Sequence, residues 1–227
     1  MCGRYTLTVS GRVLAELFEL GATPEITPRY NIAPTQRVPV VRADPRTGRE
    51  WAEVRWGLVP HWAKEASIGA RMINARSETV AEKPAFRNAV RRRRCLIPAD
   101  GFYEWQRVGQ AKVPHYIHFR DHRPFAFAGL WERWQPAGEE PLETCAILTT
   151  RPNPVLEPIH DRMPVILPRE QHQLWLGPGE LSAEQLEQLL APHPPDPMEA
   201  YAVSTRVNTP GHDDPGCVER AAAVPPP

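Results

Sequence analysis

Alternation of apolar and polar residues is the commonest pattern along this chain. Successive side chains of a strand point to opposite faces, so a period of two predicts strands with one buried face. The clearest strand is predicted over 143–150, a run rich in apolar and β-branched residues. Further short strands are expected at 4–8, 38–43, 50–56, 95–98, 101–107, 115–119, 125–131, 165–167 and 199–204.

The 3.6-residue period of a helix is seen in fewer places. One helix is predicted over 12–20, with Ser10 as its N-cap and Gly21 as its stop. Others are expected at 84–93, 170–176 and 182–190, and a short one is expected to begin at Ser77. The segments Tyr30–Thr35 and Arg55–Trp62 contain Pro, Gly or both and are interpreted as shaped loops.

The order of these elements indicates the fold class. Strands dominate and short helices interrupt them without the regular strand–helix alternation of a parallel sheet. The sequence therefore predicts an α+β fold with mainly antiparallel strands. One domain is expected over residues 1–208, followed by a disordered Pro- and Ala-rich tail at 209–227.

Composition narrows the class of protein. The chain has 227 residues, of which 41% are hydrophobic, and no apolar run approaches the ~20 residues of a membrane span. Its beginning lacks the pattern of a secretory signal, so we expect a cytoplasmic monomer, associated with the nucleoid if the source is bacterial. The four cysteines lie far apart without a C-x-x-C pair, so neither a metal nor another cofactor is expected.

Charge is unevenly distributed although the net charge is zero. Residues 1–133 contain 22 basic and 13 acidic residues, a net charge of +9, and residues 134–227 contain 5 and 14, a net charge of −9. A basic first part indicates an anionic partner there. Its longest run of cations, Arg91–Arg94, is interpreted as a solvated face.

Cys2 is the first candidate for chemistry. A small second residue generally allows removal of the initiator Met1, which would give Cys2 a free α-amine beside its thiol. An α-amine titrates near pH 7.7–8.0 and a thiol near 8.5. Such an amine condenses with an aldehyde to an imine, and the thiol of the same residue can close on that imine to form a thiazolidine. A structural role at the start of the first strand is the alternative.

Six motifs occur in one order between residue 1 and about residue 167: Met1–Tyr5, Tyr30–Thr35, Trp56–Trp62, Asn74–Glu78, Asp100–Trp105 and Ile159–Pro164. Together they make the chain resemble the SOS response-associated peptidase (SRAP) family, the proteins that capture abasic sites. The resemblance implies a curved or barrel-like sheet core with short peripheral helices. It also implies a role in the DNA damage response, in which Cys2 forms a covalent thiazolidine with an abasic site in single-stranded DNA.

The resemblance implies roles for three further catalytic residues. Glu104 matches the acid that opens the sugar ring, and its apolar neighbours would raise its pKa toward neutrality. His160 matches the histidine that moves protons during formation or reversal of the crosslink. Asn74 matches the amide that positions the N-terminus and the sugar. Without the motifs, each would be interpreted as an ordinary strand, loop or turn residue.

The resemblance also suggests a DNA-binding set. Arginines are expected on phosphates, hydroxyl groups are expected to add hydrogen bonds, and aromatic rings are expected to stack on bases. The residues are Arg4, Arg76 and Arg162, then Ser77 and Thr149, then Trp62 and Phe86. The family's peptidase activity is interpreted as removal of Met1 rather than general proteolysis.

Two other classes stay open at this level. An N-terminal-nucleophile amidohydrolase can also begin Met-Cys-Gly and use its amine as a base. Such enzymes typically have an Asn-Gly pair in the oxyanion hole, and this chain has no Asn-Gly dipeptide. A non-covalent single-strand binder would use the Arg and Trp residues but would give no reason for Cys2.

Overall fold

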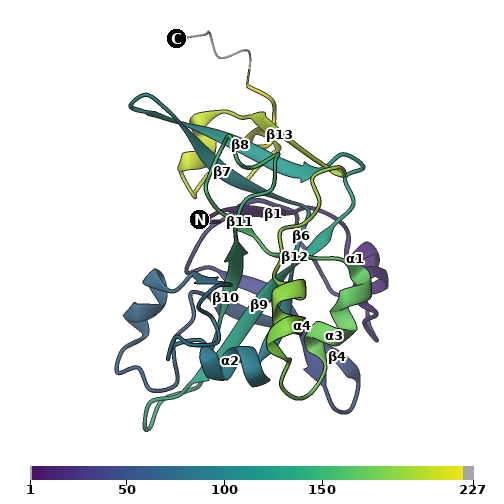
Figure 1. The fold of residues 1–227 in the computed structure, drawn as a ribbon, viewed down its shortest axis with the longest axis vertical. Coiled ribbons are helices and arrows are strands. Elements are labelled where there is room, and N and C mark those ends of the chain that lie inside the picture. Colours follow the sequence, from purple (N-terminus) through teal and green to yellow (C-terminus); the bar gives the residue numbers. More distant parts are fainter. Residues whose placement is uncertain (1, 222–227) are drawn as a thin grey trace.

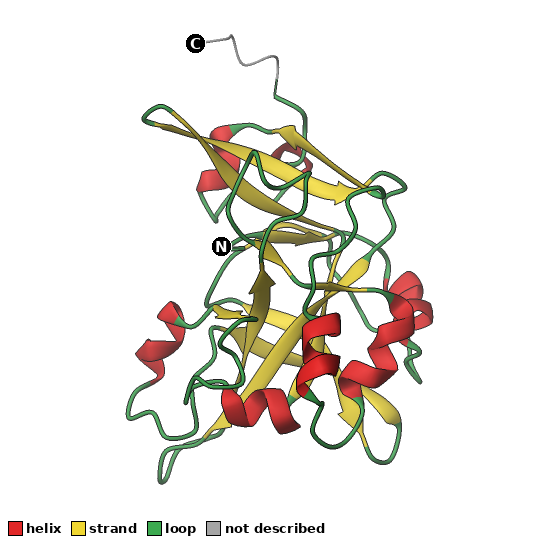
Figure 2. Ribbon diagram, viewed as in Figure 1, coloured by secondary structure: helices red, strands yellow, loops and turns green. Residues whose placement is uncertain are grey.

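The computed structural model describes residues 2–221, in which strands form two sheets and the helices are short (Figures 1 and 2). The strands are β1 (Tyr5–Leu7), β2 (Arg29–Ile32), β3 (Arg37–Asp44), β4 (Gly48–Trp56), β5 (Asn74–Arg76), β6 (Arg94–Ala99), β7 (Gly101–Val108), β8 (Ala111–Phe119), β9 (Phe125–Trp134), β10 (Leu142–Thr150), β11 (Met163–Pro164), β12 (Ile166–Leu167) and β13 (Met198–Ala202). The α-helices are α1 (Gly11–Phe18), α2 (Arg87–Arg92), α3 (His172–Leu176) and α4 (Ala183–Leu189). Four 3₁₀ segments are η1 (Ala66–Arg71), η2 (Arg169–Gln171), η3 (Thr205–Asn208) and η4 (Pro215–Cys217).

Five strands close into a barrel. β10 pairs with β4, β4 with β3, β3 with β6, β6 with β9, and β9 returns to β10. All these pairs are antiparallel except β10–β4. The predicted α+β class, the mainly antiparallel strands, the barrel-like core and the peripheral helices are confirmed (Figure 2).

A second sheet of five strands, in the order β13-β8-β7-β1-β2, lies above the barrel in Figure 1. Aromatic side chains join it to the barrel. The ring of Tyr5 in β1 contacts the rings of Trp56 in β4 and Phe127 in β9, at centroid distances of 5.4 and 5.8 Å. All three side chains are fully buried, and burial of a side chain such as Phe127 stabilises the fold by about 1.5–3 kcal/mol. The start of the chain is thereby fixed between the two sheets.

Several local predictions differ from the structure. No helix begins at Ser77; turns occupy residues 77–86, because the preceding strand β5 pairs with β10. Three strands were missed, β2, β5 and the two-residue β11, because none of them shows the alternation that identifies a strand on its own. The first helix ends at Phe18 rather than before Gly21, since Glu19 takes the left-handed conformation with φ of 52°.

The C-terminal segment also differs from the prediction. Residues 209–221, which the sequence assigns to a disordered tail, pack against the second sheet. Asp213 accepts hydrogen bonds from the backbone N–H groups of Tyr30 and Asn31, and the Asn31 amide donates to the carbonyls of Thr209 and His212. Residues 222–227 lie outside the described part of the chain.

Candidate functional site

Cys2 lies buried immediately before β1, with no exposed surface. The Asn74 side-chain amide donates to the Cys2 carbonyl at 2.9 Å. Burial raises the pKa of the Cys2 thiol, so the thiol stays protonated at neutral pH. The structure therefore brings together two residues that are 72 positions apart in the chain.

Asn74 owes its position to strand pairing. β5 runs parallel to β10, with Asn74 opposite Ile147 and Arg76 opposite Thr149. A close backbone approach precedes this strand: a Cβ atom on Gly69 would lie 2.5 Å from the carbonyl oxygen of Gly57. Only glycine allows this crossing, which leads the chain from the end of β4 into β5.

Glu104 lies on β7, and its residue is 2% exposed. It shares the face of the strand with Phe102, since side chains two residues apart point the same way. Phe102 belongs to the main core that includes Cys2. Burial raises the pKa of Glu104 to about 7, in the direction that its apolar neighbours suggest.

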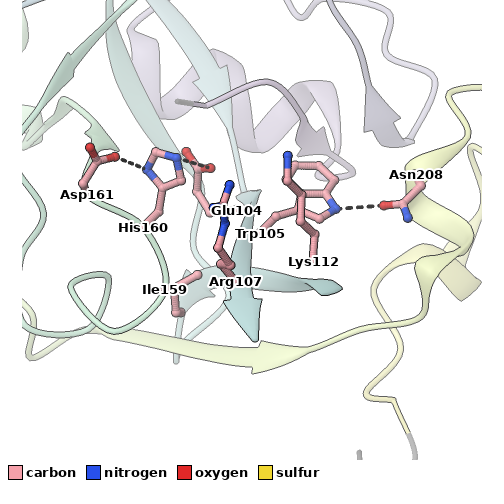
Figure 3. Close-up of a pocket in the computed structure, with 8 residues that line it drawn as sticks. All are labelled: Glu104, Trp105, Arg107, Lys112, Ile159, His160, Asp161 and Asn208. Carbon is pink, nitrogen blue, oxygen red and sulfur yellow. Dashed lines mark hydrogen bonds and ion pairs between the residues drawn. The ribbon is translucent and has the colours of Figure 1, made fainter. Parts of the chain in front are cut away.

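His160 follows a loop and faces Glu104 (Figure 3). Its Nε2 atom lies 3.8 Å from Glu104 Oε2, which is too far for a direct hydrogen bond. Its Nδ1 atom accepts the backbone N–H of Arg162 at 2.9 Å, an arrangement that leaves the proton of a neutral ring on Nε2. Burial is the main cause that lowers the pKa of His160, so both groups are uncharged over part of the neutral range.

A cavity of about 830 Å³ opens beside this pair (Figure 3). Its lining residues are Glu104, Trp105, Arg107, Lys112, Ile159, His160, Asp161 and Asn208. Trp105 is held by a hydrogen bond from its indole N–H to Asn208 Oδ1 at 2.8 Å. The sequence analysis missed Arg107, Lys112 and Asn208. Arg107 lies two residues after the Glu104 motif and Lys112 lies opposite Arg107 on β8, whereas nothing local marks Asn208.

Arg162 is the best-anchored cation of the predicted DNA-binding set. Its guanidinium donates to both carboxylate oxygens of Glu78, at 2.6 and 2.9 Å, and to the carbonyl of Thr149 at 2.6 Å. These bonds lower the pKa of Glu78, which therefore stays ionised. In this structure the charge of Arg162 is compensated by a partially exposed carboxylate.

Three buried polar atoms around Arg162 have no hydrogen-bond partner among residues 2–221: Asn74 Oδ1, Thr149 Oγ1 and Arg162 Nε. Two are acceptors, one of them a hydroxyl that can also donate, and the third is a charged donor. A buried polar group without a partner is costly, so native proteins seldom leave one without a role. These atoms are suited to bind a polar ligand that both donates and accepts.

The other predicted DNA contacts are placed differently. Arg4 donates to Asn31 Oδ1 at 2.9 Å and to the carbonyls of Val207 and Asn208, so it joins η3 to β2. Arg76 is exposed and Ser77 is half-buried at the end of β5. Trp62 is 51% exposed. Phe86 is half-buried and packs against the main core, which suits a structural role better than base stacking.

Two kinds of feature are absent from residues 2–221. No group of three or more His, Cys, Asp or Glu side chains is arranged to hold a metal ion. None of the helices in this part of the chain is long and apolar enough to cross a membrane.

The fold and site define a class: an α+β protein with a closed five-stranded barrel. A buried cysteine near the start of the chain lies close to an amide and within electrostatic range of a buried carboxyl group, which has a histidine beside it. Residues 1–210 match the family described as SOS response associated peptidase (SRAP). The chain belongs to this family, as its motifs indicate.

Named relatives match most of the chain. The abasic site processing protein YoqW of Bacillus subtilis is 45% identical over 223 residues, which cover 96% of this chain and 99% of the relative. The abasic site processing protein HMCES of Xenopus tropicalis is 31% identical and matches 87% of this chain and 68% of its own length. A crystal structure of a protein from Bacteroides thetaiotaomicron superposes with a TM-score of 0.87 at 29% identity, covering 97% of this chain and all of that one.

Proposed function

We propose that this protein processes abasic sites in single-stranded DNA by forming a thiazolidine crosslink through Cys2, which becomes N-terminal when Met1 is removed. Relatives that are named abasic site processing proteins support the substrate. The observation that carries the chemistry is the convergence of Asn74 on Cys2 and of His160 on Glu104. The family's peptidase description would then refer to removal of Met1.

The reaction begins at the abasic sugar, which is in equilibrium with an open aldehyde. Protonated Glu104 donates a proton to the ring oxygen, which its raised pKa of about 7 permits near neutral pH. The Cys2 amine then adds to the aldehyde carbon, and loss of water gives an imine. The thiol sulfur adds to the imine carbon while its proton passes to nitrogen, which closes the five-membered ring.

The remaining residues have positioning and binding roles in this proposal. Asn74 holds the Cys2 backbone and its free Oδ1 orients the incoming amine or the sugar. His160 moves protons at the opened sugar and promotes reversal of the crosslink. Arg76 and Arg162 bind phosphates on either side of the lesion, with Ser77 and Thr149 as further hydrogen-bond partners.

The test is incubation of the purified protein with a single strand bearing one abasic site, followed by a denaturing gel and intact mass. The protein should lack Met1 and should form a heat-stable adduct whose mass is the sum of protein and DNA less one water. Cys2→Ala should lose the stable adduct and retain at most an imine that borohydride traps. A normal yield of stable adduct from Cys2→Ala, or binding without any adduct from the parent, contradicts the proposal.

A further inference from the structure

Helix α2 presents a cationic surface that the proposed reaction does not use. The helix directs Ala89 and Val90 into the core, where they are 1% and 3% exposed. Its other four residues are exposed and none is acidic: Arg87, Asn88, Arg91 and Arg92, which we call the α2 surface. In Figure 1 this helix lies at the end of the barrel away from the second sheet.

The four consecutive arginines at 91–94 have different environments. Arg94 is 6% exposed, and its guanidinium donates to the carbonyls of Trp175, Gly177 and Gly179 and of two α2 residues. Arg93 lies 3.3 Å from buried Glu132. Arg94 and Arg93 therefore serve the fold, and the sequence expectation of a solvated face applies to Arg91 and Arg92 alone.

Arg87 and Arg92 have no side-chain partner in the part of the chain that the structure describes. Arg91 has only a loose, exposed ion pair with Glu180 at 3.8 Å. Neither Arg87 nor Arg92 makes a side-chain hydrogen bond or an ion pair with any residue between 2 and 221. Their charges are therefore available to a ligand.

Helix stability does not account for this arrangement. Cations in the last turn, such as Arg91 and Arg92, favour a helix because they oppose its dipole. Arg87 lies in the first turn, where a positive charge is unfavourable, and it is four residues from Arg91, a spacing at which like charges repel. A partner that carries negative charge would remove both penalties.

The surface is also shaped for an extended anion. A cavity of about 360 Å³ is lined by His61, Asn88, Arg91, Arg92, Arg93 and Glu180. The exposed indole of Trp62 follows His61, and its turn is anchored by a hydrogen bond from the Trp134 indole to the Ala63 carbonyl at 2.7 Å. Cations beside an exposed aromatic ring are the combination that tracks a single nucleic-acid strand.

The surface lies on the same segment of the chain as part of the candidate site. One segment, residues 57–92, carries the Trp62 turn, then Asn74–Ser77 of the site, then α2. In the barrel, Arg94 of β6 lies opposite Leu130 of β9, and Leu130 lies opposite Ala146 of β10. Ala146 is three residues before Thr149. At ~3.3 Å per residue and ~4.8 Å per strand step, Arg94 lies about 10 Å along the strands and up to about 10 Å across them from Thr149, a separation that a DNA strand of about four nucleotides spans.

We propose that the α2 surface, with the turn at His61–Trp62, binds the phosphate backbone of the DNA strand several nucleotides away from the lesion. This inference rests on the proposed function, because it assumes that an abasic strand occupies the site. It goes beyond that function by giving the protein a second contact that covers the undamaged flank and increases its affinity for long strands.

The test compares a trinucleotide and a fifteen-nucleotide single strand, each with a reduced abasic sugar in the middle. A reduced sugar has no aldehyde, so the measurement reports non-covalent binding. Arg87→Gln with Arg92→Gln should weaken binding of the long strand about tenfold at 0.1 M salt and lower the slope of log K against log salt by about 1.4, since each phosphate contact in a single strand contributes ~0.7. Binding of the trinucleotide should match the parent.

The matched control is Arg12→Gln with Arg120→Gln, which removes the same charge from exposed sites elsewhere on the molecule. This control should bind both strands like the parent. Unchanged binding of the long strand by the Arg87 and Arg92 variant, or an equal loss with the trinucleotide or in the control, overturns the inference. Crosslinking of the aldehyde-bearing trinucleotide by the parent tests the proposed function separately, so the two failures are distinguishable.

Discussion

Glu104 and His160 form a pair of titratable groups in which burial disfavours both charged forms. The usual attraction between a carboxylate and an imidazolium is therefore replaced by a neutral carboxyl group beside a neutral imidazole that presents its Nε2–H. The protonated carboxyl group can donate a proton near pH 7. This is the property that opening of a sugar ring requires.

The proposed role of Glu104 predicts how the proposed crosslinking depends on pH. Because the pKa is raised to about 7, the donating form is present below that pH and disappears as pH rises through it. The rate of adduct formation should therefore fall above pH 7. The growing fraction of uncharged Cys2 amine opposes this fall. Glu104→Gln should slow formation at pH 7 by about 10²–10⁴-fold, the usual contribution of a general acid, with little change in DNA binding. A parent-like time course for Glu104→Gln would contradict the assigned role.

The raised pKa of Glu104 also makes the free energy of unfolding depend on pH. A carboxyl group whose pKa rises on folding stabilises the folded state at low pH, and this contribution is lost as pH rises through the folded-state value. For Glu104 the window runs from its ordinary value of 4.5 to about 7. Glu104→Gln should therefore lose less stability than the parent between pH 5 and 8, as urea denaturation at the two pH values would measure.

The carboxylate of Glu78 compensates the positive charge of Arg162. The carboxylate neutralises a guanidinium that the proposed function assigns to phosphate binding, so DNA must displace it or bind despite it. Glu78→Gln should raise affinity for undamaged single strands several-fold and steepen the salt dependence by up to ~0.7. Glu16→Gln, an exposed glutamate on α1, is the control for net charge. Weaker binding by Glu78→Gln would show instead that Glu78 serves to orient Arg162.

At the scale of elements, α2 and the loop after α3 are joined through Arg94. The buried guanidinium donates to five backbone carbonyls, which a lysine ammonium with three donors cannot reproduce. Arg94→Lys should lower the free energy of unfolding by about 3 kcal/mol, since several buried carbonyls lose a charged donor. Arg92→Lys, two residues away and exposed, should change it by less than about 0.5 kcal/mol. Urea denaturation of both variants is the measurement, and equal effects would contradict the structural role.

The short strands β5 and β11 position the site because both pair with β10. β5 has three residues and, among residues 2–221, pairs only with β10, so its register depends on the Gly57–Gly69 crossing and on β10 itself. β11 pairs with the same end of β10, where Thr149 and Thr150 lie opposite Pro164 and Met163. The end of β10 thus fixes Asn74 from one segment and the residues next to Arg162 from another.

At the scale of the whole molecule, the C-terminal segment holds the second sheet together. Asn31 is fully buried and donates to carbonyls of Val207, Thr209 and His212, while Asp213 accepts from the N–H groups of β2. A chain that ends at residue 208 should therefore be less stable than the full chain by several kcal/mol, because buried polar groups of β2 lose their partners. Thermal unfolding of the two chains measures this. An unchanged midpoint would support the sequence prediction that the tail begins at 209.

The sequence by itself determined much of the fold. The sequence predicted the five barrel strands, β3, β4, β6, β9 and β10. Each shows its apolar pattern within a short stretch of consecutive residues. It also indicated the family, because the motifs that surround Cys2, Asn74, Glu104 and His160 are local too. These motifs identify residues with suitable chemistry, and the residue types can be recognised without knowing their positions in the fold.

Only the tertiary structure decided which of these residues meet and which cations are free. The pairing of β5 with β10, the closure of β9 on β10 and the contact of Asp213 with β2 all join distant segments, so no local window contains them. The same holds for charge: one arginine of the run at 91–94 is buried on carbonyls, one lies beside a buried carboxylate, and two face solvent. A side chain's pKa and its freedom to bind depend on burial and on partners, and both are set by the assembled fold.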